Sequence, residues 1–250
     1  MYLINNQLVI DLASYVNIQA LIDQKPQFDY AVVKSSKLVT PARYYKIQFL
    51  DQRHLGLQDV LGTYTNASPG ELDFLQDLRD HDLLASWLRY NNDLIYGQQS
   101  VPIIYPKDWV TKHLKKETIE TENTKYFKFF FDWLENEQIF AEFGRVCVFL
   151  NEPGVATPIH FDSNDATRRD EFIWLSLGNK KKFFIYDETT NTKHYLNSPI
   201  GTFDATNYHG SEPGEFASWS IRVDGIFSDS FLLKTDLYNH FRQPTQSNIS

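Results

Sequence analysis

Residues 146–162 read VCVFLNEPGVATPIHFD, and this stretch decides the fold that we expect of the chain. Residues 146–150 form a short apolar run of strand length, which is the pattern of a buried strand. The tripeptide Glu-Pro-Gly at 152–154 is typical of a turn. A second extended segment over 157–162 follows it and carries a histidine and an aspartate two positions apart. The stretch therefore predicts two strands of an antiparallel sheet, the second with polar side chains of chemical interest.

The same alternation of short strands and turns continues toward the C-terminus. Turn-forming pairs such as Gly178-Asn179 and Pro213-Gly214 separate the segments. Eight or so short antiparallel strands suit a double-stranded β-helix, the jelly-roll or cupin-like barrel that can hold a ligand between its two sheets. We expect strands at 145–150, 157–162, 171–177, 181–187, 193–197, 200–203, 207–211, 217–224 and 226–233.

The N-terminal half predicts helices with a few strands, so the expected fold class is α+β. Ser68, Pro69 and Glu71 form a helix start, with an N-cap, a first-turn proline and an acidic residue three positions after the cap. We expect helices at 69–91 and 124–141, a shorter helix that begins at residue 11 or 14 and reaches residue 22, and strands at 8–10 and 30–33. The prediction is one domain over 1–250, with a mostly helical support region at 1–142, the barrel at 143–235 and a tail at 236–250.

Composition limits the classes of protein and partner. The chain has 250 residues, of which 42% are hydrophobic, enough for a sizeable core. A net charge of −8 argues against a nucleic-acid partner, which normally requires a basic face. The single cysteine, Cys147, lies in an apolar strand pattern, so we expect a buried thiol and a reducing compartment. No signal sequence or apolar run of about 18 residues is visible, which predicts a cytoplasmic protein without a membrane partner; the sequence favours no oligomeric state.

Candidate metal ligands occur at strand positions of the predicted barrel. His160 and Asp162 alternate along one strand, so both side chains can reach a single ion. His209 stands in a later predicted strand, and two imidazoles with one carboxylate are the ligand set of a non-haem Fe(II) site that leaves three coordination positions open. Arg222, on the following strand, offers a planar, permanently charged fork for a carboxylate. We predict His160, Asp162 and His209 as the metal-binding and catalytic residues, and Arg222 as the anchor of an anionic cosubstrate.

This order of residues, with the segment at 203–210 that precedes the distal histidine, resembles the Fe(II)- and 2-oxoglutarate-dependent oxygenases over roughly residues 143–235. The resemblance implies that Fe(II) is held by His160, Asp162 and His209, and that 2-oxoglutarate chelates the metal while its far carboxylate pairs with Arg222. Dioxygen is implied as the second cosubstrate. Hydroxylation is the implied outcome, because related halogenases have a small residue in place of Asp162.

Two residues are alternatives to this assignment. Lys180 follows a glycine-asparagine turn and resembles the strand lysine with which the JmjC branch of the superfamily binds the cosubstrate carboxylate. We favour Arg222, because an arginine fork binds a carboxylate through two parallel hydrogen bonds and a lysine does not. His194 is an alternative distal ligand, but no arginine follows it at a comparable distance.

Three functions remain open from the sequence. The first is an oxygenase that hydroxylates a small molecule, such as an amino acid or a biosynthetic intermediate, and the negative charge of the chain is compatible with a neutral or cationic substrate. The second is a JmjC-like hydroxylase of protein or peptide side chains. The third is a cupin-like barrel that binds a metal or ligand without turnover. A metal triad together with a carboxylate anchor argues against the third.

Overall fold

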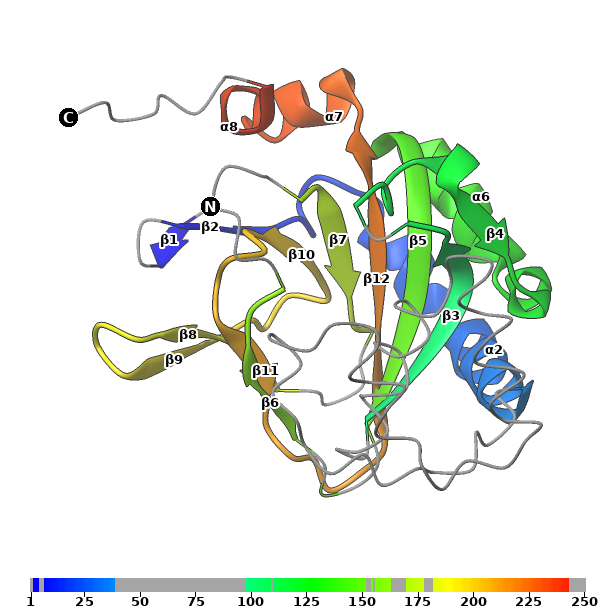
Figure 1. Ribbon diagram of the computed structural model, residues 1–250, viewed down its shortest axis with the longest axis horizontal. Helices are drawn as coiled ribbons and strands as arrows, with labels where there is room; N and C mark the ends of the chain where they lie inside the picture. Colours follow the sequence, from blue (N-terminus) through cyan, green and yellow to red (C-terminus); the bar gives the residue numbers. More distant parts are fainter. Residues whose placement is uncertain are drawn as a thin grey trace, which may run out of the picture.

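The computed structural model describes residues 2–4, 7–38, 98–108, 110–151, 154, 156–162, 170–177 and 182–242 (Figure 1). Eight consecutive strands form its centre. They are β5 (Phe140–Asn151), β6 (Thr157–His160), β7 (Phe172–Leu175), β8 (Phe183–Asp187), β9 (Thr192–Tyr195), β10 (Ile200–Phe203), β11 (His209–Ser211) and β12 (Ser218–Phe227).

These strands are divided between two antiparallel sheets. The larger sheet has the order β1-β2-β10-β7-β12-β5-β3-β4, and the smaller has the order β6-β11-β8-β9. From β5 to β12 the chain passes back and forth between the sheets. As a result, the four barrel strands of the larger sheet (β10, β7, β12 and β5) lie opposite the smaller sheet. This is the strand order of a double-stranded β-helix, so the predicted jelly-roll barrel is confirmed.

The N-terminal region also contributes strands to the larger sheet. These are β1 (Tyr2–Ile4), β2 (Gln7–Asp11), β3 (Gln98–Pro106) and β4 (Thr118–Glu120). β2 pairs with β10 at one edge of the barrel, and β3 pairs with β5 at the other. The barrel sheet is therefore extended by residues that precede 143, although the division of the chain at 142 stays a prediction.

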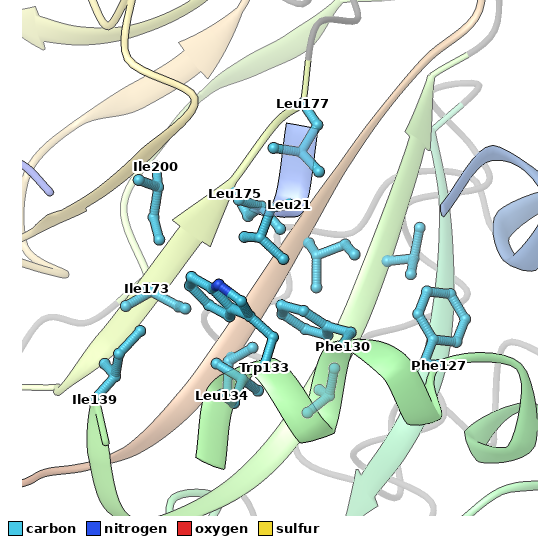
Figure 2. Close-up of a cluster of buried hydrophobic side chains, with 14 of the residues drawn as sticks. Leu21, Phe127, Phe130, Trp133, Leu134, Ile139, Ile173, Leu175, Leu177 and Ile200 are labelled. Atoms are coloured by element: carbon cyan, nitrogen blue, oxygen red, sulfur yellow. The ribbon is translucent and has the colours of Figure 1, made fainter. Parts of the chain in front are cut away.

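Helices cover the outer face of the larger sheet, as expected. α1 (Ile18–Asp23), α2 (Lys25–Leu38) and α6 (Lys128–Glu137) provide this cover, two 3-10 turns lie at Lys115–Glu117 and Glu122–Tyr126, and α7 (Asp229–Lys234) and α8 (Tyr238–Arg242) follow the last strand. Figure 2 shows Phe130, Trp133 and Leu134 of α6 together with Ile173 and Leu175 of β7. Burial of each such side chain contributes about 1.5–3 kcal/mol, so this layer accounts for much of the stability of the fold.

The inner face of the larger sheet points toward the smaller sheet and is lined differently. Side chains alternate along β12, so Ile221 and Val223 join the core under the helices, while Arg222 and Asp224 point between the sheets. A separate apolar cluster lies between the sheets and consists of Val9, Phe172, Trp174, Phe183, Ile185, Phe203 and Ala205. The barrel thus encloses charged side chains beside an aromatic lining.

Some predicted elements are wrong. Residues 30–33 belong to α2 rather than a strand, because Phe28, Ala31, Val32 and Ser35 are buried at helical spacing. The strand predicted at 226–233 ends at Phe227, since Ser228 accepts a hydrogen bond from Phe231 N (3.1 Å) and caps α7.

Other predictions differ only in their boundaries, or lie outside the described residues. The helix predicted at 124–141 ends at Glu137, because Gln138 takes a left-handed conformation (φ 52°) that turns the chain into β5. The strand predicted at 8–10 is confirmed as part of β2. The helix predicted at 69–91 and Lys180 lie outside the described residues.

Cys147 is a buried free thiol on β5, as expected. Among the helices that the structure describes, none combines the length and the apolar character needed to cross a bilayer.

Candidate metal centre

The three predicted ligands come from two neighbouring strands of the smaller sheet. His160 is the last residue of β6 and His209 is the first residue of β11. Asp162 was expected within the strand but lies two residues beyond its end. The backbone N–H of Asp162 donates to the carbonyl oxygen of Ala205 (2.9 Å), and this bond fixes Asp162 against the connection that leads into His209.

A register irregularity between β6 and β11 aligns the two histidines. His209 is paired with His160, but Ser211 is paired with Thr157, so two steps along β11 span three along β6. The Ser211 hydroxyl donates to Thr157 Oγ1 (2.8 Å), which shows that these two side chains meet as well. Irregularities of this kind re-aim side chains and occur frequently next to active sites. Here the result is a pair of imidazole rings with centroids 4.3 Å apart.

The ligand atoms of His160, Asp162 and His209 all lie within 4.8 Å of one another. Asp162 Oδ1 is 3.7 Å from His160 Nε2, and Asp162 Oδ2 is 3.8 Å from His209 Nε2. A metal about 2.1 Å from each ligand atom brings neighbouring ligand atoms to about 3 Å from one another. The two distances from Asp162 to the imidazoles therefore need to shorten by less than about 1 Å to hold an ion, and the two imidazoles and one carboxylate fit Fe(II).

His209 is prepared to act as a neutral ligand. Burial, together with the neighbouring His160, lowers the pKa of His209 to about 4. The Nδ1–H of His209 donates to the carbonyl oxygen of Asn207 (2.9 Å), so the lone pair of Nε2 faces the other two ligands. Phe203 and Phe183 surround this ring, with centroids 5.0 and 5.6 Å away. The side chain of His160 is less buried than that of His209, since 44% of it is exposed.

Arg222 reaches the ligand group from the larger sheet. Its Nη1 donates to Asp162 Oδ2, its Nε donates to Asp224 Oδ1 (3.0 Å), and the guanidinium carbon lies 3.8 Å from the ring centre of Phe172. Burial alone would raise the pKa of Asp162, but Arg222, helped by the two histidines, holds it well below the usual range. The predicted carboxylate anchor is therefore beside the predicted ligands, where carboxylates of the chain itself engage it.

One edge of the Arg222 guanidinium has an unused donor. Nη2 is buried and forms ion pairs with Asp224 Oδ1 (3.0 Å) and Asp170 Oδ2 (3.9 Å), but it makes no hydrogen bond within the part of the chain that the structure describes. A buried donor without an acceptor is costly. This edge therefore suits an additional acceptor such as the carboxylate of a ligand.

Further buried charges surround Arg222 and were missed from the sequence. Lys112 Nζ lies 2.7 Å from Asp170 Oδ2, and Arg145 Nε donates to Asp224 Oδ2 (2.5 Å). Burial lowers the pKa of Lys112. We call Lys112, Arg145, Asp170, Arg222 and Asp224 the buried ion cluster. Alternation gave a usable signal for Arg145 and Asp224, each of which interrupts an apolar strand, whereas Lys112 comes from a turn without a pattern.

The two alternative residues are not part of this geometry. His194 lies on β9 opposite Ile185 and is not a member of the group formed by His160, Asp162 and His209. Lys180 falls outside the described residues, so its role as an anchor stays a prediction.

No protein-family model and no curated protein matches the sequence, whereas solved structures do. The chain is similar to a prolyl-4-hydroxylase from Pseudomonas putida, with 14% identity, coverage of 61% of this chain and 95% of that chain, and a TM-score of 0.32. It is also similar to an oxidoreductase of the 2OG-Fe(II) oxygenase family from Burkholderia pseudomallei, with 8% identity, coverage of 51% of this chain and 66% of that chain, and a TM-score of 0.35. A third similar structure is an RmlC-like cupin protein from Desulfovibrio desulfuricans, with 13% identity, coverage of 35% of this chain and 73% of that chain, and a TM-score of 0.26. Oxygenases of the superfamily that the sequence resembles are thus among the similar structures, and at these values the likeness concerns the fold alone.

Proposed function

We propose that this protein is a non-haem Fe(II)- and 2-oxoglutarate-dependent oxygenase that hydroxylates a small molecule, such as an amino acid or a biosynthetic intermediate. One observation carries the proposal. Inside a double-stranded β-helix, two imidazoles and one carboxylate converge within 4.8 Å, and a buried arginine contacts the carboxylate. A barrel that serves only as a scaffold has no need to bury this combination of groups.

The residues present fit the cofactor and cosubstrate of such an enzyme. His160, Asp162 and His209 would hold Fe(II), and a set of three protein ligands would leave coordination positions for 2-oxoglutarate and dioxygen. The end of the Arg222 guanidinium formed by Nη1 and Nη2, of which Nη2 makes no hydrogen bond in the described part of the chain, would receive a carboxylate of 2-oxoglutarate. Bound together, Fe(II), 2-oxoglutarate and dioxygen would supply the oxidising chemistry that hydroxylates a substrate carbon.

The chain itself provides position, charge and exclusion of water. Burial keeps His209 neutral, and its hydrogen bond to Asn207 fixes the ring. Asp162 remains ionised, as a ligand must be. Phe203 and Phe183 close the inner side of the centre. Of the three predicted ligands, only His160 has a substantially exposed side chain, so we place the entry of substrate on the His160 side.

An anaerobic titration tests the proposal. Fe(II) and 2-oxoglutarate are added to the wild-type protein and to His160→Ala, and the weak visible charge-transfer band of the chelated metal is followed. We expect the band in the wild-type protein and its loss in His160→Ala. His194→Ala is the matched control and should retain the band, because His194 lies outside the ligand group. A folded wild-type protein without the band would favour the non-catalytic barrel.

The substrate class is tested separately by release of succinate. Free amino acids and the same residues within short peptides are compared under identical conditions. Turnover with the free compounds supports the small-molecule assignment. Turnover with the peptides alone contradicts it and favours the hydroxylase of peptide side chains.

A further inference from the structure

We infer that Arg222 couples the binding of the metal to the binding of a carboxylate ligand, because its guanidinium group is shared between Asp162 and that ligand. The inference rests on the proposed function, since it needs a metal at Asp162. It goes further by giving Arg222 a second role. In the absence of metal, Arg222 neutralises Asp162. After the metal has bound Asp162, Arg222 receives the carboxylate of the small molecule.

The contacts of Arg222 show how the sharing works. Asp224 binds the Nε side of the guanidinium at 3.0 Å, and Phe172 supports one face of the group at 3.8 Å, so the group is held in place independently of Asp162. Nη1 is the end that donates to Asp162. Nη2 is buried without a hydrogen bond in the described part of the chain. The arginine can therefore exchange Asp162 for another carboxylate without moving away from Asp224.

The pairing of buried charges gives the direction of the coupling. Among the described residues around Arg222, Nη1 of Arg222 pairs with Asp162, whereas Arg145 pairs with Asp224 and Lys112 with Asp170. A metal that takes Asp162 leaves Nη1 of Arg222 without its carboxylate partner, in a region where an unpaired charge is costly. A carboxylate bound at Arg222 restores this pairing. Because coupling free energies are reciprocal, the same carboxylate must also tighten the binding of the metal.

Glutarate is a probe that separates this coupling from simple chelation. It has the length and the two carboxylates of 2-oxoglutarate but lacks the 2-oxo group that chelates a metal. Co(II) affinity is measured calorimetrically in the wild-type protein with no addition, with saturating glutarate and with the uncharged glutaramide. We expect glutarate to tighten Co(II) binding by about 5-fold or more, the lower range of allosteric coupling, and glutaramide to leave it unchanged. The Co(II) absorption spectrum reports whether glutarate itself becomes a ligand.

Two variants assign the effect to Arg222. Arg222→Gln should bind Co(II) more tightly than the wild-type protein without additions, because Asp162 no longer has a competing partner, and it should lose the response to glutarate. Arg145→Gln is the matched control, since it removes the same charge from the buried ion cluster but pairs with Asp224 and not with Asp162. It should retain the response.

The outcomes distinguish the inference from the proposed function. Co(II) binding that requires His160 but does not respond to glutarate in the wild-type protein overturns the coupling and leaves the oxygenase proposal intact. A response that persists in Arg222→Gln, with a changed Co(II) spectrum, also overturns it, because glutarate is then a direct ligand. Absence of Co(II) binding that depends on His160 overturns the proposed function and the coupling together.

Discussion

Among single residues, Asp224 is held by several buried cations. It is fully buried on β12, where Oδ2 accepts from Arg145 (2.5 Å) and Oδ1 accepts from Arg222 (3.0 Å). Lys112 Nζ is also within 3.7 Å. The Asp224 carboxylate thus bridges two guanidinium groups and fixes the direction of Arg222, which reaches the candidate metal centre.

Replacement of Asp224 by asparagine should therefore be strongly destabilising. Asp224→Asn keeps the shape of the side chain but leaves buried cations without their counter-ion, which costs about 3–5 kcal/mol. Urea unfolding measures the loss. Glu212→Gln is the control, because the pair of Glu212 with Lys193 is partly exposed and should contribute less than about 1 kcal/mol. Equal losses in the two variants would contradict the role given to Asp224.

The same residue predicts a dependence of stability on pH. Burial alone would raise the pKa of Asp224, but Arg145, followed by the two neighbouring cations, holds it well below the usual range. A carboxyl group with a lower pKa in the folded than in the unfolded state stabilises the fold fully above about pH 4 and loses this contribution as the pH falls further. The free energy of unfolding of the wild-type protein should fall more steeply than that of Asp224→Asn below about pH 4. Parallel curves in that range would show that Asp224 is not the group responsible.

Among the elements, the contact between β6 and β11 positions two of the three predicted ligands. Gly210 lies at the irregular step, and a Cβ there would meet Thr157 O at 2.7 Å and the Phe184 ring at 2.9 Å. The close approach of the strands at this point excludes any side chain. The spacing of His160 and His209 thus depends on a residue that has no side chain of its own.

Gly210→Ala should separate β6 from β11. We expect a loss of about 1–3 kcal/mol in the free energy of unfolding, typical of an overpacked interior, and weaker Co(II) binding because the imidazoles no longer face each other. Gly214→Ala is the control, since the nearest atom to its Cβ would be 3.3 Å away. Calorimetry measures both the stability and the metal affinity. Unchanged metal affinity in a destabilised Gly210→Ala would show that the ligand group tolerates a change in strand spacing.

The elements also show what the sequence could predict. Strands of the barrel were predictable because apolar and polar residues alternate and turn residues separate them. His160, Asp162, His209 and Arg222 could be selected from residue type and spacing, since two imidazoles and one carboxylate are followed by an arginine. The segment at 30–33 was misassigned, since β-branched residues favour strands locally while the core under the helices requires a helix there. Lys112 could not be predicted, because only the folded chain brings its turn beside β5 and β12.

At the scale of the whole molecule, the barrel depends on residues far from it in sequence. Phe28 of α2 and Phe130 of α6 pack in the same core as Ile221 of β12. β2 and β3 continue the sheet at its two edges. After the last strand, Arg242 of α8 donates to Glu171 (2.7 Å), next to the start of β7. The larger sheet of the barrel is therefore packed against residues from both ends of the described chain.

A fragment of residues 140–250 should consequently fail to fold alone, although it contains all eight barrel strands. Its larger sheet would expose the apolar face that α1, α2 and α6 cover, and no near-ultraviolet circular dichroism signal of packed aromatic residues should develop. Mixing it with a fragment of residues 1–139 should restore the signal, because the two share one core. A cooperative urea transition of the 140–250 fragment alone would contradict this expectation and support the boundary predicted at 142.

The position of Cys147 has a practical consequence. The only thiol of the chain, that of Cys147, lies on β5 and is completely buried. Thiol-directed probes can therefore be attached at newly introduced surface cysteines without first removing a native one. A nitroxide placed at Thr189, on the exposed turn between β8 and β9, would report its distance from a paramagnetic ion bound at His160, Asp162 and His209.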